Sequence, residues 1–559
     1  MSVNISKQKR DVLISKVKEL KDFIATCPQD QNTQNLLGYI GDILKEINRK
    51  KYGLVFEEHQ EGIDILLKNN MPILTEEKDL SIKNGGEQNF LIEGDNLAAL
   101  QLLEKTHKGK IDVIYIDPPY NTGNKDFIYD DSFVDSTDEF KHSKWLSFIE
   151  KRLLISKNLL NEKGVVFISI NDIEVAQLRL VLDSIFGESN YLAEIAWQCL
   201  DTIKNDAKYF SNNHEYVLCY AKKIESFKMQ GIMKGEKQRA YYKNYDNDPR
   251  GDYLLTPLHA KSGTESGIYS YTFSNGQTWT PPKGTFPRFS KETLSKLDKE
   301  GRLYLDPNCR KTPQKKTYYS DVGDRMPAPS FWDYANYGST RQSNKELADI
   351  IGKGMFQNPK PTKLISILLD LFENNKSSTI LDFFAGSGTT GHAVLKLNSE
   401  DGGHRKFILC TNNENNICRD ITYQRLKTVI TGKRKDGSTY SDGLPGSLKY
   451  LKVGFIPVND QMYYEYADQL LENIRTLVEL ENTVDMDNSK TVSIILDDDE
   501  LEKFIDSIDQ HSECKSLYLS HDVLISSEQE QKLHKKGIEI KTVPEYYYPD
   551  TETRGDDEH

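Results

Sequence analysis

Residues Ile111–Tyr120 read IDVIYIDPPY, an apolar run that meets two prolines. The run predicts a buried strand, and Asp117-Pro118-Pro119-Tyr120 must end it, because proline cannot donate to a sheet ladder. In open α/β sheets, ligands bind beyond the carboxyl ends of the strands. The turn is therefore expected to present a carboxylate, prolyl carbonyl groups and an aromatic ring to a ligand.

These groups match the exocyclic amino group of a nucleobase, whose lone pair is delocalised into the ring. The Asp117 carboxylate can accept one amino hydrogen and the Pro118 carbonyl the other, while Tyr120 stacks on the base. An ordinary Pro-Pro turn at the end of a strand explains the same residues equally well. A second motif is needed to decide between them.

That second motif is SSTILDFFAGSGTTGHAVLKL (377–397), which predicts a strand at Thr379–Phe384, a Gly-rich turn at Ala385–Gly388 and a helix from Thr389. Glycines let the backbone approach a ligand, and a helix amino end offers unpaired N–H groups to an anion. GSGTTG (386–391) also fits the dinucleotide pattern GxGxxG, so an NAD(P)-dependent oxidoreductase is an alternative. That alternative leaves the DPPY turn without a role.

Strands and helices alternate around both motifs, which predicts a mainly parallel sheet flanked by helices. Asp95 follows one expected strand, where it either caps the next helix or contacts a ligand. Glu414 follows another, where its carboxylate could hold ribose hydroxyl groups. The remaining expected strands of this sheet are Phe90–Ile92, Val165–Ile170, 214–222, Lys406–Thr411 and Leu448–Ile456. A helix with Leu146, Ile149, Leu153 and Leu160 on one face is expected before Val165. In the acidic tail the pattern predicts helices near Tyr464–Leu480 and Asp498–Ile508 and strands at Val492–Leu496 and Ile538–Val543.

Charge is distributed unevenly along the 559 residues, whose net charge is −13. From Gly446 onward the net charge is −15, whereas between Asp201 and Lys345 it is +8. Basic residues interleaved with aromatic residues, as in this mid-chain segment, suit phosphate contacts and base stacking. An irregular insertion without a ligand is the alternative for this segment.

The seven cysteines show no CxxC pair, so neither a disulfide framework nor a metal site is expected. No apolar stretch reaches 18 residues, and we expect a soluble, cytoplasmic protein. Five parts are predicted: an N-terminal helical segment, a first half of the core, an inserted domain, a second half of the core and a small acidic α/β module. Their bounds are 1–60, 61–222, 223–345, 346–456 and 457–559.

DPPY and DFFAGSGTT together resemble the signature pair of amino-methylating, S-adenosylmethionine-dependent DNA methyltransferases, and their order resembles the circularly permuted β class. The wider pattern resembles the modification (Mod) subunits of type III restriction–modification systems. It is carried by DPPYNTGNKDFIYDDSF, HEYVLCYAK, GQTWTPPKGTF, GRLYLD, NPKP and RKFILCTNNENN.

This resemblance implies a Rossmann-like methyltransferase fold with an inserted target-recognition domain and no metal. It implies that Asp117, Pro118, Pro119 and Tyr120 receive an adenine flipped out of the duplex. In related enzymes an aspartate at the first position of the motif accompanies adenine N6, and a serine accompanies cytosine N4. The implied cofactor residues are Asp382, Phe384, Gly386, Gly388 and Thr389 with Lys360 and Pro361 at the methionine part, and Asp95 and Glu414 at the adenosine.

The resemblance also implies partners: double-stranded DNA, a second copy of the chain and a helicase–nuclease restriction subunit. The acidic module is a candidate docking site for that subunit. Alternatives are a cytosine-N4 methyltransferase, a non-catalytic DNA-binding specificity subunit, and an RNA or protein amino-methylase.

Overall fold

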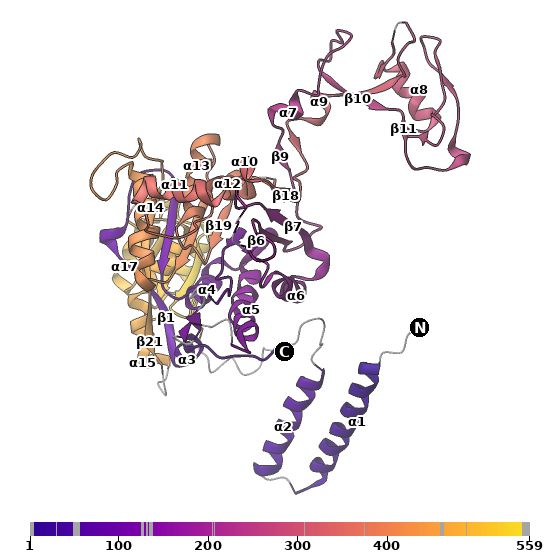
Figure 1. Cartoon of the computed structure of the whole chain (residues 1–559). Coiled ribbons are helices and arrows are strands. Elements are labelled where there is room, and N and C mark those ends of the chain that lie inside the picture. Colours follow the sequence, from indigo (N-terminus) through magenta and orange to yellow (C-terminus); the bar gives the residue numbers. More distant parts are fainter. Residues whose placement is uncertain are drawn as a thin grey trace.

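The computed structural model describes residues 5–28, 31–48, 56–123, 128–129, 132–133, 138–203, 205, 207–306, 308–373, 375–458, 463–487 and 489–549. Its centre is a ten-stranded sheet (Figure 1), in which the six neighbouring strands from β21 to β6 run parallel. In spatial order the strands are β1 (Asn70–Glu76), β21 (Ser447–Pro457), β2 (Gln88–Glu93), β20 (Lys406–Thr411), β19 (Thr379–Asp382), β3 (Ile111–Ile116), β6 (Leu160–Ile170), β8 (Glu215–Ala221), β7 (Tyr191–Trp197) and β18 (Phe331–Trp332).

Two buried layers cover the faces of this sheet. In β3, Ile114 and Ile116 belong to one layer, while Val113 and Tyr115 belong to the other. This alternation explains why the strand is apolar throughout, because it is buried on both sides. Helices of the first layer are α4 (Asn96–His107), α5 (Lys141–Leu159) and α6 (Val175–Phe186); those of the second are α11 (Thr340–Ile351), α12 (Thr362–Leu369), α13 (Thr389–Asp401) and α14 (Tyr423–Thr431).

The predicted alternation and the mainly parallel sheet are confirmed, with some differences in the elements. Leu160, which the helical pattern placed on the apolar face of α5, instead begins β6. The strands β1 and β7 were not predicted. Segment 214–222 does form a strand, β8, but it pairs antiparallel with β6 and so begins at the edge where β3 ends.

The inserted segment leaves and re-enters the main domain through a two-stranded neck, β9 (Ile232–Met233) paired with β17 (Arg325–Met326). Beyond the neck it projects away from the main sheet (Figure 1) and has its own small core around Trp279. Its main elements are α7 (Glu236–Arg239), β10 (Tyr253–Pro257), β11 (His259–Ala260), β12 (Tyr271–Thr272), β13 (Thr278–Trp279), β14 (Phe286–Pro287), α8 (Lys291–Lys299), β15 (Leu303–Tyr304), β16 (Gln314–Tyr318) and α9 (Tyr319–Val322).

Residues after the neck belong to the main domain, so the inserted part is shorter than 223–345. β18 pairs with β7 in the main sheet, and α10 (Tyr334–Tyr337) and α11 follow it. Trp332 and Tyr337 stack on each other within the second buried layer.

The ends of the chain form two further units. At the N-terminus, α1 (Ile5–Thr26) and α2 (Gln31–Asn48) make a helical hairpin, as predicted (Figure 1). At the C-terminus a parallel three-stranded sheet has the order β22-β23-β24. The helix expected at 464–480 is two helices, and β23 and α18 were not predicted. The C-terminal elements are α15 (Tyr463–Glu472), α16 (Ile474–Asn482), β22 (Val492–Ile495), α17 (Asp498–Asp506), β23 (Ser516–Ser520), α18 (Ser527–Lys535) and β24 (Glu539–Val543).

The C-terminal module is packed into the main domain, because Tyr466, Leu470, Leu477 and Tyr547 lie in the first buried layer. In the part of the chain that the structure describes, every helix is too short or too polar to cross a membrane.

Candidate active site

The two sequence motifs meet because their strands are neighbours. β3 and β19 pair in parallel, with Ile114 opposite Leu381, so the DPPY turn and the Gly-rich turn leave the same edge of the sheet. The segment before α12 joins them: the Thr389 hydroxyl donates to the Lys360 carbonyl oxygen at 3.2 Å, and the Lys360 ammonium donates to Asp117. Residues far apart in the sequence thus form one site.

The DPPY turn is held by hydrogen bonds from three side chains. Lys360 Nζ lies 2.8 Å from each oxygen of the Asp117 carboxylate. The Tyr120 hydroxyl donates to Asp117 Oδ1 at 2.9 Å. Trp145 Nε1 donates to the Pro119 carbonyl at 2.7 Å. The base-binding hypothesis uses the other prolyl carbonyl, that of Pro118.

Glu215, the first residue of β8, is a member of the site that sequence reasoning missed. Its Oε2 accepts a hydrogen bond from the Tyr120 hydroxyl at 3.1 Å and lies 3.4 Å from Lys360 Nζ. Burial lowers the pKa of Lys360, but the carboxylates of Asp117 and Glu215 outweigh this effect, so the pKa is raised above its ordinary value. The signal in the sequence was a single charged residue at the start of an apolar strand.

The Gly-rich turn is braced by Asp382, the last residue of β19. Its Oδ1 accepts from the Phe384 N–H at 3.0 Å and its Oδ2 from the Thr390 hydroxyl at 2.5 Å. Burial raises the pKa of Asp382 to about 7. Gly386 and Gly388 have φ values of 49° and 74°, a conformation that favours glycine.

The third glycine of GSGTTG has a packing role. A Cβ at Gly391 would lie 2.7 Å from Leu426 Cδ2, so this glycine lets α13 approach α14. The third glycine of a dinucleotide fingerprint has the same packing role, so Gly391 does not distinguish the two cofactor classes.

Arg425 of α14, also missed from the sequence, is fully buried beneath the turn. Its guanidinium donates to the Thr389 hydroxyl at 2.8 Å and to the Thr362 hydroxyl at 3.0 Å. Burial lowers its pKa to about 10. The side chain of Thr389 is therefore committed within the protein, and its backbone is the part that can face a ligand.

The residues expected at an adenosine lie at the same edge, because β2 and β20 are neighbours. Asp95 caps α4, with its Oδ1 accepting from the Leu97 N–H at 2.7 Å, so the capping role is confirmed. Its Oδ2 lies 3.7 Å from Arg152 Nη2, and the side chain is 39% exposed. Glu414 is exposed just after β20.

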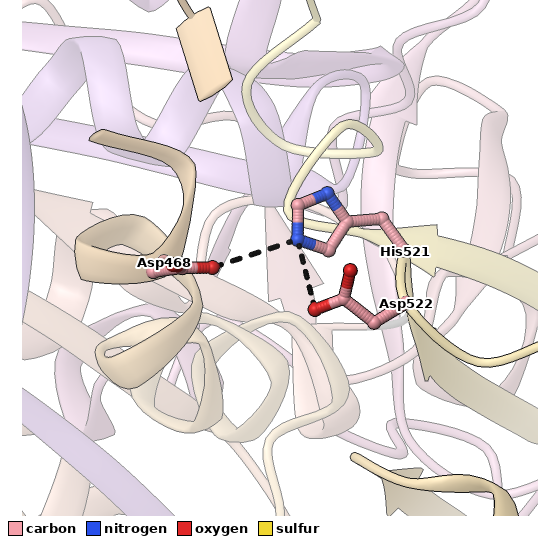
Figure 2. A group of neighbouring side chains, drawn as sticks. All are labelled: Asp468, His521 and Asp522. Atoms are coloured by element: carbon pink, nitrogen blue, oxygen red, sulfur yellow. Dashed lines mark ion pairs between the residues drawn. The ribbon is translucent and has the colours of Figure 1, made fainter. Parts of the chain in front are cut away.

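Another group of described residues, Asp468, His521 and Asp522, lies in the C-terminal module and has side chains of the metal-ligating kind (Figure 2). His521 Nε2 is 3.8 Å from Asp468 Oδ1 and 3.6 Å from Asp522 Oδ2, and both aspartates are more than 70% exposed. The group is carried by elements other than those that form the site.

Comparison with known proteins identifies the class. The family model described as DNA methylase matches residues 111–423, and the chain belongs to this family. Among its relatives, the StyLTI Mod subunit of a type III restriction–modification enzyme from Salmonella typhimurium is 33% identical over 62% of this chain and 56% of its own length. The EcoPI Mod subunit of Escherichia phage P1 is 31% identical over 73% and 72%, and the type II methyltransferase M.KpnI of Klebsiella pneumoniae is 31% identical over 70% and 96%.

This chain thus spans about half the length of the StyLTI Mod subunit and nearly all of M.KpnI.

Among solved structures, a modification methylase of Thermus thermophilus in complex with S-adenosylmethionine has a TM-score of 0.31 at 13% identity, covering 65% of this chain and 99% of its own. The cytosine-N4-specific PvuII DNA methyltransferase has a TM-score of 0.32 at 12% identity, covering 59% and 85%.

Proposed function

We propose that this chain transfers a methyl group from S-adenosylmethionine to N6 of adenine at a short site in double-stranded DNA. The observation that carries the proposal is the junction of the Asp117 turn with the Gly-rich turn at one edge of the sheet, linked through Lys360. A group donor at one turn and an amino acceptor at the other would lie side by side.

The backbone of the Gly-rich turn and the carboxylates near it fit S-adenosylmethionine. Gly386 and Gly388 have no Cβ atoms, so the backbone at these two positions can approach a ligand, and α13 presents its amino end beside them. The half-exposed Asp95 and the exposed Glu414 suit the polar ribose. When bound, the cofactor supplies a methyl group on a positively charged sulfur.

The chain's own residues orient the amino group. Asp117 is too weak a base to deprotonate an aryl amine. It accepts a hydrogen bond that localises the nitrogen lone pair, and the Pro118 carbonyl accepts the second amino hydrogen. Correct alignment of the reacting atoms supplies much of the rate acceleration. The proton leaves after transfer, when the nitrogen is cationic and acidic.

Adenine is favoured by the first residue of the motif, Asp117. Three relatives are Mod subunits of type III enzymes, which supports the same assignment. Cytosine N4 is the second candidate, because its exocyclic amino group offers two hydrogens to the same pair of acceptors, the Asp117 carboxylate and the Pro118 carbonyl.

The experiment uses tritiated S-adenosylmethionine with mixed-sequence duplex DNA, followed by hydrolysis and identification of the labelled base. Label in N6-methyladenine that is lost in Asp117→Ala supports the proposal. Label in N4-methylcytosine would overturn the base assignment, and label only in RNA or protein would overturn the DNA substrate.

We further propose that the inserted segment recognises the DNA sequence and that a helicase–nuclease subunit docks on this chain in the cytoplasm. The relatives named as type III Mod subunits support the second part, whereas M.KpnI, a type II methyltransferase, resembles the chain over nearly all of its own length. Co-purification with a type III restriction subunit supplied in the same cells tests it: a methylase that binds none is a solitary enzyme.

A homodimer through the N-terminal hairpin completes the proposal. Leu20, Phe23, Tyr39 and Ile43 are each at least 48% exposed on the two helices, an unusual concentration of apolar surface. Phe23→Glu with Leu20→Glu should convert a dimer into a monomer in light scattering while DNA-independent cofactor binding persists. A dimer that survives both changes would place the interface elsewhere.

A further inference from the structure

Four side chains form a closed, largely buried network at the DPPY turn. Lys360 is paired with two carboxylates, Asp117 and Glu215, and the Tyr120 hydroxyl is within hydrogen-bond distance of both. The exposed fractions of the three charged side chains are 9% for Lys360, 28% for Asp117 and 23% for Glu215. With both carboxylates ionised and Lys360 protonated, the net charge of the network is −1.

The network creates a conflict for the reaction that the proposed function requires. Asp117 must accept a hydrogen bond from the target amino group, yet Lys360 Nζ lies at 2.8 Å from both of its oxygens. An ammonium bonded to both oxygens of a carboxylate is a stronger partner than a neutral amine. Lys360 and Tyr120 already use three of the roughly four acceptor positions of the Asp117 carboxylate, and the ammonium draws its negative charge. Asp117 is therefore a stronger acceptor for the target amino group when another anion holds the ammonium.

Glu215 is that other anion, because it already lies 3.4 Å from Lys360 Nζ. It is also fixed in place, since β8 pairs with β6 and β7 on either side. The Tyr120 hydroxyl lies within hydrogen-bond distance of both carboxylates and can donate its one proton to either, and its ring centroid is 5.0 Å from Lys360 Nζ.

We propose that Glu215 is a positioning residue that takes the Lys360 ammonium from Asp117 when the target base enters, which frees Asp117 to orient the amino group. This inference rests on the proposed methyl transfer and adds to it a required exchange of ion-pair partners. Loss of the Glu215 charge should leave Lys360 on Asp117 and slow methylation without weakening the cofactor site.

The test is Glu215→Gln, assayed by tritium transfer to mixed-sequence duplex DNA from pH 6.5 to 9.5. We expect kcat at pH 7.5 to fall by about tenfold or more. A tenfold change corresponds to about 1.4 kcal/mol of lost attraction between the ammonium and Glu215. Dissociation constants for S-adenosylmethionine should stay within about twofold. The rate of the variant should stay low across this pH range, because Lys360 keeps its charge and its pairing with Asp117.

The matched control is Glu225→Gln, the same chemical change at an exposed residue after β8, which should match the native rate at every pH. A second variant pair guards against misfolding: in a Lys360→Met background, adding Glu215→Gln should change the rate by less than about twofold, since no ammonium remains to be moved. A slowed Glu215→Gln variant together with the loss of this effect in the Lys360→Met background supports the inference.

The two proposals fail in different ways. Native protein that binds S-adenosylmethionine but labels no DNA would remove the proposed function. Native protein that labels DNA would leave the function standing, and either of two results would then overturn the role of Glu215. One is a Glu215→Gln variant that matches the native rate; the other is a Glu215→Gln change that slows Lys360→Met as much as it slows the native protein.

Discussion

Asp382 is a buried carboxyl group whose pKa lies near neutral pH. Burial raises its pKa to about 7, against the hydrogen bonds from Phe384 and Thr390 that favour the charged form. Since the folded pKa lies above the unfolded value, ionisation costs stability as the pH rises from about 4 through 7. A cationic ligand beside the turn would offset that cost.

We therefore predict that affinity for S-adenosylmethionine, which carries net positive charge, increases by about tenfold from pH 6 to pH 8. Titration calorimetry of the native protein would measure this increase. Asp382→Asn should bind more weakly and lose the pH dependence. Asp442→Asn, an exposed aspartate in the loop before β21, should retain it. Equal pH dependence in both variants would exclude Asp382 as its source.

At the same scale, local motifs were predictable and their partners were not. Asp117, Gly386 and Gly388 could be found because each stands in a short pattern with a backbone reason for its place. Glu215 and Arg425 could not, because their roles arise from contacts with Lys360 and Thr389, which are distant in the sequence. The strand order of the main sheet and the packing of its helices bring these residues together, and both are properties of the whole domain.

At the scale of elements, Glu481 in α16 connects the C-terminal module to the main domain. Its carboxylate accepts hydrogen bonds from the Tyr518 hydroxyl of β23 at 2.8 Å and from the Tyr547 hydroxyl, and Lys110 before β3 lies at 3.1 Å. Burial raises the pKa of Glu481, but these donors outweigh burial and the pKa is lowered to about 2.

We predict that Glu481→Gln lowers the free energy of unfolding by about 3 kcal/mol at pH 7, the linkage value of a shift of about two and a half pKa units. Because the folded pKa is depressed, this stability is present above the unfolded pKa near 4.5 and is lost as the pH falls toward 2. Urea unfolding at pH 7 and pH 3 measures both values. The exposed Glu528→Gln should change stability by less than about 0.5 kcal/mol.

If Glu481→Gln and Glu528→Gln unfold at the same urea concentration, the contacts of Glu481 with Tyr518, Tyr547 and Lys110 contribute little to stability. The same packing implies that removal of residues 460–559 would uncover the first buried layer, so point variants are better probes of this module than truncation.

The sequence pattern predicted most elements because their faces follow period 2 or period 3.6. It missed β7, in which only Ile195 and Trp197 are fully buried, and β1, which lies at the edge of the sheet. It also placed the end of the insertion too late, because the main-sheet pairing of the two-residue strand β18 leaves no local signal.

At the scale of the whole molecule, the insertion is joined to the main domain only over a short distance at its ends. The Lys234 N–H donates to the Asp324 carbonyl at 2.7 Å, just beyond the β9–β17 pair. At the base of the neck, Asp370 holds Arg325 at 2.9 Å and Gln230 at 3.3 Å.

We predict that replacing residues 234–324 with a short Gly-Ser linker leaves the main domain folded and able to bind S-adenosylmethionine, because the closing distance is already short. Methylation of duplex DNA should be lost. Circular dichroism, calorimetry and tritium transfer check the three expectations. Residual site-specific methylation by this variant would move sequence recognition to the main domain.

The neck also bears on how such proteins diversify. Two crossovers, one in each strand of the neck, would exchange everything beyond it and leave the chemistry untouched. A lineage that shares the neck could acquire a new target sequence in a single recombination event, whereas a change to the acidic module would have to preserve the core into which that module is packed.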